Sequence, residues 1–235
     1  MTNFVLVHGA WHGGWCWKRV ARILRAKGHE VYTPSLTGLA ERSHLVNRNV
    51  NLETHILDIV NLLQWEELSD VVLCGHSYGG QVITGAADRS ADRIGALVYL
   101  DAFVPENGQC LLDGMSAERR AMMIERASHD PDGRLMTPIP AAAFQVNTAD
   151  QAWVDRMCVP HPLACFEQKI VLTGAADGIA KRTYIEAAGF SPSSFTPIAA
   201  RLRLNDAWTV TSLPCGHDAM IDMPERVAEL LIAAA

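Results

Sequence analysis

The sequence predicts an α/β protein in which a mostly parallel, doubly wound sheet of about six strands is covered by helices. Short runs of aliphatic and β-branched residues alternate with longer amphipathic segments along most of the chain. This alternation is typical of a parallel sheet whose strands are buried on both faces. A length of 235 residues suits one domain of this class.

The first elements follow that alternation in order. Residues 4–7 form an apolar run that His8-Gly9 ends, which predicts a buried strand. Residues 17–27 have apolar side chains at helical spacing, and Gly28 follows them as a helix-ending residue. A brief second strand is expected over residues 30–33.

A helix begins after Asn51, and its spacing gives it one apolar face. The residues of that face are Leu52, Ile56, Ile59, Val60 and Leu63. Residues 71–74 and 94–100 are the third and fourth predicted strands, separated by a glycine-rich turn and a helix of small residues.

The alternation stops after residue 101 and resumes at residue 182. The segment 102–181 holds five of the eight methionines, together with short helical patterns and loops, so we expect a helical cap inserted into the sheet domain. The core is therefore predicted to be residues 1–101 and 182–235. Its last elements are expected as strands over 182–187 and 208–213 and helices over 194–204 and 224–234.

Composition excludes several classes of function. The net charge of -6, without a Lys/Arg cluster, gives no footprint for nucleic acid or anionic membranes. No apolar run is long enough to span a bilayer, and the N-terminus does not resemble a signal peptide. Six cysteines without a CxxC pair do not indicate a zinc or redox site. We therefore expect a cytoplasmic protein with reduced thiols; the sequence leaves a homodimer open.

The sharpest motif is Gly75-His76-Ser77-Tyr78-Gly79, a G-x-S-x-G between a predicted strand and a predicted helix. Glycines at both ends allow a tight turn that holds a serine hydroxyl above the sheet. The helix N-terminus behind it favours developing negative charge. This context predicts that Ser77 is a nucleophile and that the amide of Tyr78 is one donor of an oxyanion hole.

With this motif, the sequence resembles the α/β-hydrolase family, and within it the small plant esterases that act on methyl salicylate and similar methyl esters. Their relatives, the hydroxynitrile lyases, are also similar. Besides the elbow, the resemblance rests on residues 7–15, which read VHGAWHGGW, and on Gly216-His217-Asp218-Ala219-Met220. It implies the α/β-hydrolase fold and places the second oxyanion donor at the amide of Ala10. His12 is left open between a contact to substrate and a role in orienting its loop.

The general base is expected at His217, because it follows the last predicted strand and fits the chain order nucleophile, acid, base. His76 is interpreted as a packing residue of the elbow. The acid departs from the family pattern, which places Phe190 where an aspartate is expected. Asp101, directly after the fourth strand, is the favoured substitute, since some family members carry their acid there.

Two other carboxylates are candidates for the acid. Asp177 would follow a strand if residues 170–173 form one, and Asp206 precedes the last strand, at the wrong end of the sheet.

The predicted function is a serine carboxylesterase with a Ser-His-Asp triad, needing no metal or organic cofactor. Its expected partner is a small apolar ester, with an aromatic or methyl ester as one form, because methionine and aromatic residues of the cap suit an apolar pocket. A hydroxynitrile lyase is an alternative, although the lyases' threonine and lysine are replaced by Gly9 and Asp218. A non-catalytic small-molecule receptor is the other alternative.

Overall fold

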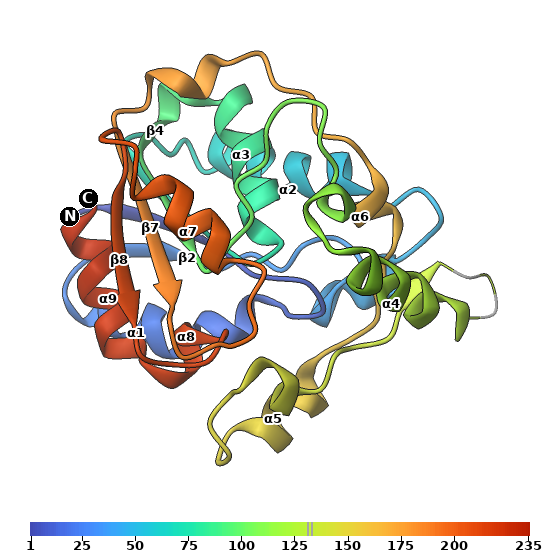
Figure 1. Ribbon diagram of the computed structural model, residues 1–235. Helices are drawn as coiled ribbons and strands as arrows, with labels where there is room; N and C mark the ends of the chain where they lie inside the picture. Colours follow the sequence, from blue (N-terminus) through green and yellow to red (C-terminus); the bar gives the residue numbers. More distant parts are fainter. Residues whose placement is uncertain (131, 133) are drawn as a thin grey trace.

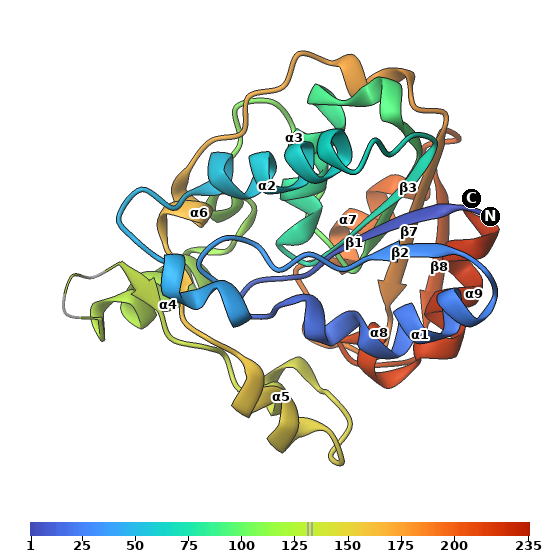
Figure 2. The ribbon, with the colours of Figure 1, turned by 180° about the vertical axis from the view of Figure 1, so that it is seen from behind.

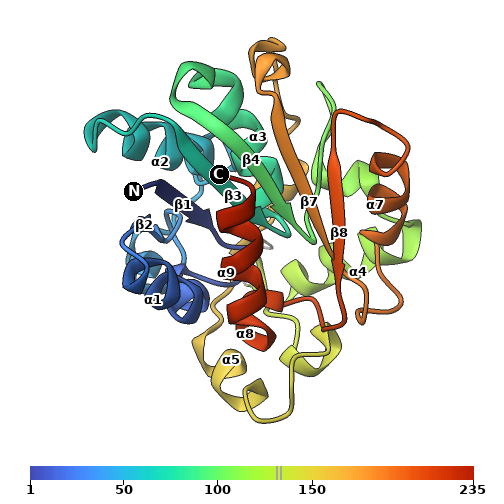
Figure 3. The ribbon, with the colours of Figure 1, turned by 90° about the vertical axis from the view of Figure 1, so that its left-hand side faces the viewer.

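A six-stranded, fully parallel sheet organises the computed structural model, which describes residues 1–130, 132 and 134–235. The strand order is β2-β1-β3-β4-β7-β8 (Figure 3). The strands are β1 (Asn3–Val7), β2 (Glu30–Tyr32), β3 (Val71–His76), β4 (Ile94–Leu100), β7 (Lys181–Ala187) and β8 (Thr209–Leu213). Each predicted strand is therefore present, with ends that differ by at most two residues.

Helices cover both faces of this sheet. One face carries α1 (Lys18–Ala26), α8 (Ala219–Asp222) and α9 (Pro224–Ala233), and the other carries α2 (Leu52–Trp65), α3 (Gly79–Arg89) and α7 (Thr196–Leu202). In Figure 3, α1 and α9 lie in front of the sheet and α2 and α3 lie behind it. The predicted doubly wound α/β fold is confirmed.

Two hydrophobic cores result from the alternation of side chains along the strands. Phe4 and Leu6 of β1 point to the core beneath α1 and α9, whereas Val5 and Val7 point to the core beneath α2 and α3. All four side chains are fully buried. Strands buried on both faces read as continuous apolar runs, which is why sequence patterns locate them well.

The segment between β4 and β7 lies at one end of the sheet, away from both chain termini (Figure 1 and Figure 2). It contains α4 (Ala117–Ser128), α5 (Gln151–Met157) and α6 (Ala164–Glu167). It also contains a short antiparallel pair, β5 (Leu135–Met136) and β6 (His161–Pro162), where the sequence predicted only helices and loops. Two-residue strands carry too little pattern to be detected without their partner.

The carboxyl ends of the parallel strands meet at the edge that faces this segment. The elbow follows β3, Asp101 follows β4, and the loop with His217 follows β8. In open α/β sheets this edge is where ligands bind. In the part of the chain that is described, no helix has the length and apolar character to cross a membrane. All six cysteines are free thiols.

Candidate active site

The turn after β3 is as tight as the glycines of the motif predict. A Cβ atom on Gly75 would lie 2.5 Å from the carbonyl oxygen of Gly79, and one on Gly79 would lie 2.7 Å from the carbonyl oxygen of His8. Distances this short are not tolerated, so only glycine lets β1, β3 and α3 approach each other here.

Ser77 stands at the apex of this turn in a left-handed backbone conformation, with φ of 55°. A non-glycine residue there carries strain of about 1 to 2 kcal/mol. Backbone hydrogen bonds hold it in place: its N–H donates to Leu100 at 3.3 Å, and its carbonyl accepts from Phe103 at 3.2 Å. The neighbouring strand β4 and the chain that follows it therefore fix the serine.

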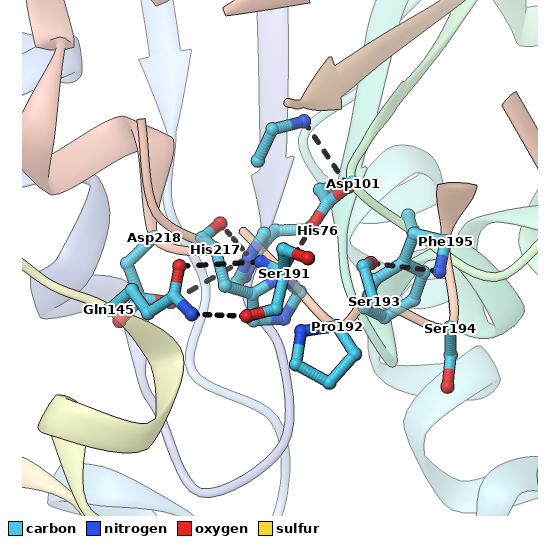
Figure 4. A network of polar contacts seen from close by, with 12 residues as sticks. His76, Asp101, Gln145, Ser191, Pro192, Ser193, Ser194, Phe195, His217 and Asp218 are labelled. Atoms are coloured by element: carbon cyan, nitrogen blue, oxygen red, sulfur yellow. Dashed lines mark hydrogen bonds and ion pairs between the residues drawn. The ribbon is translucent and has the colours of Figure 1, made fainter. Parts of the chain in front are cut away.

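His217 and Asp101 are joined by a short hydrogen bond. His217 Nδ1 donates to Asp101 Oδ2 at 2.6 Å, and the amide of Ala187 donates to Asp101 Oδ1 at 3.2 Å (Figure 4). The Asp101 side chain is fully buried. Burial raises the pKa of its carboxyl, while the hydrogen bond and charge of His217 lower it, and the net direction is upward. The bond leaves Nε2 of His217 free of the carboxylate.

Aromatic rings enclose the imidazole of His217. Phe195 stacks on it with ring centroids 4.9 Å apart and an interplanar angle of 9°, and Phe190 and Phe144 lie at 5.0 and 5.3 Å. Its backbone N–H donates to the carbonyl of Phe144 at 2.9 Å. These contacts restrict the ring to one orientation and keep water from its hydrogen bond with Asp101.

A cavity of about 440 Å³ brings the predicted residues together. Ser77, His217, Ala10 and Tyr78 all line it. Nine further aromatic or methionine residues line it as well. These nine are Trp11, Phe103, Met115, Met122, Met123, Phe144, Phe166, Phe190 and Phe195. A volume of this size suits a small organic molecule.

Ala10 and Tyr78, whose amides are the predicted oxyanion donors, both line this cavity. Tyr78 is the N-cap of α3, so its amide precedes the first hydrogen-bonded turn of the helix. Ala10 belongs to the loop after β1, where Trp11 adopts a left-handed φ of 64°. The side chain of Tyr78 is not part of this predicted oxyanion hole, because its hydroxyl is hydrogen-bonded to His55 Nδ1 at 2.8 Å.

The wall of the cavity near His217 is closed by Gln145. Its side-chain amide donates to the carbonyl of Ser191 at 2.6 Å and accepts from the Ser191 N–H at 3.3 Å (Figure 4). This pair joins the segment between β4 and β7 to the loop after β7.

Comparison with known proteins identifies the family to which this fold belongs. The model of the family described as Alpha/beta hydrolase family matches residues 4–230. The chain belongs to the alpha/beta hydrolase family. A Carbendazim hydrolyzing esterase from Nocardioides sp. (strain SG-4G) is 49% identical over 240 residues, which cover 99% of each chain.

Two further alpha/beta hydrolases extend the comparison. Salicylic acid-binding protein 2 from Nicotiana tabacum is 34% identical over 106 residues, 45% of this chain and 41% of that protein. A solved extracellular alpha/beta-hydrolase from a Paenibacillus species, described as similar in structure and function to the tobacco protein, superimposes with a TM-score of 0.88. It is 25% identical and the match covers 100% of this chain and 99% of that one. Together these relatives support a carboxylesterase acting on small esters.

The other carboxylates weighed for the acid lie elsewhere in this alpha/beta hydrolase. Residues 170–173 do not form a strand, and Asp177 is exposed in a turn just before β7. That is the amino end of the strand, across the sheet from His217. Asp206 is likewise exposed, ahead of β8.

Sequence reasoning missed one buried carboxylate, Asp218. Its Oδ2 lies 3.1 Å from Nε2 of His12, and its Oδ1 lies 3.7 Å from Nε2 of His76. His76 does more than pack, because its Nε2 donates to the backbone carbonyl of His217 at 3.0 Å. The available signal was the position of Asp218, directly after the predicted base.

Two groups of buried side chains in the described residues could offer ligands to a metal ion, with ligand atoms within 4.8 Å of one another. They are His55, His161 and Cys165, and His76, His217 and Asp218. Hydrogen bonds already engage several of these atoms. Both ring nitrogens of His55 are bonded, to Tyr78 and to the carbonyl of Thr37, and His217 Nδ1 is bonded to Asp101.

Proposed function

We propose that this alpha/beta hydrolase is a serine carboxylesterase that hydrolyses small, apolar esters through an acyl-serine intermediate on Ser77. The observation that carries the proposal is the convergence on one apolar cavity of a strained serine, an imidazole and two backbone amides. The imidazole is held from behind by a buried carboxylate. Residues 102–181 act as the cap that encloses this cavity.

In the first half of the reaction, Ser77 attacks the carbonyl carbon of the ester and His217 Nε2 takes the hydroxyl proton. Asp101 accepts the Nδ1 hydrogen, which fixes the tautomer with a free Nε2 and stabilises the imidazolium. The amides of Ala10 and Tyr78 bind the oxyanion. The intermediate collapses, the ester C–O bond breaks, and His217 returns its proton to the leaving alcohol.

In the second half, a water molecule gives a proton to His217 and attacks the acyl-serine. The tetrahedral intermediate again places its oxyanion on the two amides. Its collapse releases a carboxylic acid and restores the hydroxyl of Ser77. Each step uses the chain's own side chains, its amides and water.

The lining of the cavity supports a flat, apolar substrate. Phenylalanine rings surround His217, and three methionines form part of the wall contributed by the cap. Methionine adapts to different shapes, so we expect several related esters to be accepted. Aromatic methyl esters and carbendazim, the compound named for the 49% identical relative, are the substrates to test first.

The direct test measures ester hydrolysis and covalent labelling in parallel. Wild-type protein should hydrolyse p-nitrophenyl acetate and should react with a fluorophosphonate at Ser77, located by peptide mass spectrometry. Ser77→Ala should lower kcat by about 10⁴-fold or more and should not be labelled, since it removes the nucleophile.

Ser69→Ala is the matched control, because Ser69 is an exposed serine ahead of β3 and does not line the cavity. It should keep both activity and labelling. Esterase activity that survives in Ser77→Ala would refute the mechanism. A wild-type protein that binds aromatic esters without hydrolysis or labelling would instead be a receptor.

A further inference from the structure

A buried ion pair links the two loops that carry the proposed oxyanion donor and the proposed base. His12 and Asp218 are 206 residues apart in sequence, and His12 Nε2 lies 3.1 Å from Asp218 Oδ2. The exposed fraction of His12 is 1% and that of Asp218 is 0%. Neither side chain lines the cavity, so neither is placed to touch a substrate.

The other nitrogen of His12 is bonded within its own loop. Its Nδ1 donates to the carbonyl oxygen of Ala10 at 2.8 Å, across the left-handed residue Trp11. This bond closes the turn that presents the amide of Ala10. His12 also stacks on Trp15, with ring centroids 5.1 Å apart and an interplanar angle of 19°. The imidazole is thereby fixed in the plane that both of its bonds require.

Asp218 connects this turn to the neighbouring loop. It follows His217 directly and is the N-cap of α8. His76, whose ring is buried beside His12, donates to the carbonyl of His217. The three histidines 12, 76 and 217 lie next to the carboxylate, and the thiols of Cys16, Cys158 and Cys215 are also close enough to feel its charge.

The charges are divided unequally among these groups. Burial lowers the pKa of His12. The charge and hydrogen bond of Asp218 together raise this pKa by more than burial lowers it, so the net direction is upward. Burial drives the pKa of His76 well below its ordinary value, and the charge of His217 adds to this. Burial raises the pKa of Asp218, and His12 outweighs that effect and lowers it. Because each ring nitrogen of His12 faces an oxygen acceptor, the geometry fits an imidazolium–carboxylate pair, next to a His76 whose pKa is strongly lowered.

We propose that His12 and Asp218 are positioning residues, which hold the Ala10 amide in register with the loop of His217. The inference rests on the proposed function, because it concerns the alignment of that oxyanion hole. His12 acts by donating to the Ala10 carbonyl, and Asp218 acts by anchoring the far side of the ring. Misplacing one oxyanion donor should lower kcat by about 10- to 100-fold, part of the 10²- to 10³-fold lost when a donor is removed.

Two double variants that differ only in the donor to Ala10 provide the test. Both carry Asp218→Asn, which removes the buried charge; one adds His12→Ala and the other adds His12→Asn. The asparagine amide can occupy the place of the imidazole Nδ1 and donate to the same carbonyl, whereas alanine cannot. Each protein is assayed for kcat and KM with p-nitrophenyl acetate, and its Tm is measured.

We expect His12→Ala/Asp218→Asn to lose about 10- to 100-fold in kcat with KM within about threefold of wild type. His12→Asn/Asp218→Asn should regain about tenfold of that loss. Asp218→Asn alone should lose less kcat than His12→Ala/Asp218→Asn, since neutral His12 can accept from the new amide and still donate to Ala10. The matched control, Asp222→Asn, removes a carboxylate of the same helix that bonds Asn147 instead, and should be unchanged.

Equal kcat values for the two double variants would overturn the proposal, as would losses that follow Tm alone. If the alanine version does not fold, ¹⁵N NMR of the wild-type histidines decides. A protonated Nδ1 on His12 is expected, and an unprotonated one at neutral pH refutes the donor role. Activity that persists in Ser77→Ala would remove the proposed function itself, whereas the outcomes above concern only the pair.

Discussion

Replacing Asp101 by asparagine changes a single acceptor behind His217 and so tests the proposed triad. In the structure, one carboxylate oxygen accepts from His217 Nδ1 at 2.6 Å and the other from the Ala187 amide at 3.2 Å. Asparagine can satisfy the Ala187 amide only with its oxygen, which turns its NH₂ group toward Nδ1. His217 then has to accept at Nδ1 and carry its hydrogen on Nε2, where it cannot take a proton from Ser77.

The expected loss in kcat is about 10³- to 10⁴-fold, the size found when an asparagine imposes the wrong tautomer on a triad histidine. This corresponds to about 4 to 5.5 kcal/mol of transition-state stabilisation at 1.36 kcal/mol per tenfold. The free energy of unfolding should not fall with it. Because the pKa of Asp101 is raised in the folded protein, its charge costs stability at neutral pH, and the neutral amide relieves that cost.

The assay is therefore kcat with p-nitrophenyl acetate, set beside Tm for the same samples. Asp177→Asn is the matched control, since Asp177 is an exposed carboxylate at the opposite edge of the sheet. Near wild-type turnover in Asp101→Asn, together with a collapse in Asp177→Asn, would refute the assignment. So would a loss of activity that merely follows a lower Tm.

Three shorter predictions accompany it. Tyr78→Phe should leave kcat within about threefold, because the backbone amide is kept. It should lower the unfolding free energy by about 1 to 3 kcal/mol, because Nδ1 of buried His55 loses the tyrosine hydroxyl and keeps only the weak Cys165 thiol; kinetics and urea denaturation separate the two effects. Gly75→Ala should abolish activity and lower Tm, whereas Gly178→Ala, whose Cβ would meet nothing within 4 Å, should do neither. Asp218→Asn should have a lower unfolding free energy than wild type in urea denaturation, and the difference should be largest between about pH 4 and 6.5. The difference should shrink at higher pH, because His12 loses its proton in the wild type, and in acid, because Asp218 gains one.

The central strands β1, β3 and β4 could be predicted because they are buried on both faces and read as nearly uninterrupted apolar runs, whereas the edge strands β2 and β8 are only partly buried. The elbow could be predicted because its glycines are needed by local sterics, which act within a few residues. The pairing of β5 with β6 could not, because two-residue strands separated by more than 20 residues are defined only by the fold. The cap boundaries, the cytoplasmic location and the catalytic roles stay predictions.

The buried ion pair shows a different limit. His12 and Asp218 lie near opposite ends of the chain, and each looks ordinary in its own loop. Only the contact between the loop after β1 and the loop after β8 makes them partners, and only burial makes their charges consequential. A sequence motif records which residue types surround a nucleophile, but it does not record which distant side chains orient its loops.

The register of the strands explains why Phe190 can stand where the family pattern has an aspartate. β4 and β7 are neighbours, and the amide of Asp101 donates to the carbonyl of Ile185 at 2.7 Å, so the end of β4 lies beside the end of β7. A carboxylate on either strand can therefore reach the same Nδ1 of His217. With the proposed acid directly after β4, position 190 is free for an aromatic ring, and the ring centroid of Phe190 lies 5.0 Å from that of the imidazole. That ring shields the hydrogen bond between His217 and Asp101 from water, which strengthens it in a low-dielectric site. Placing the proposed acid one strand earlier thus leaves the direction of the proposed proton transfer unchanged and gives the site an additional apolar wall.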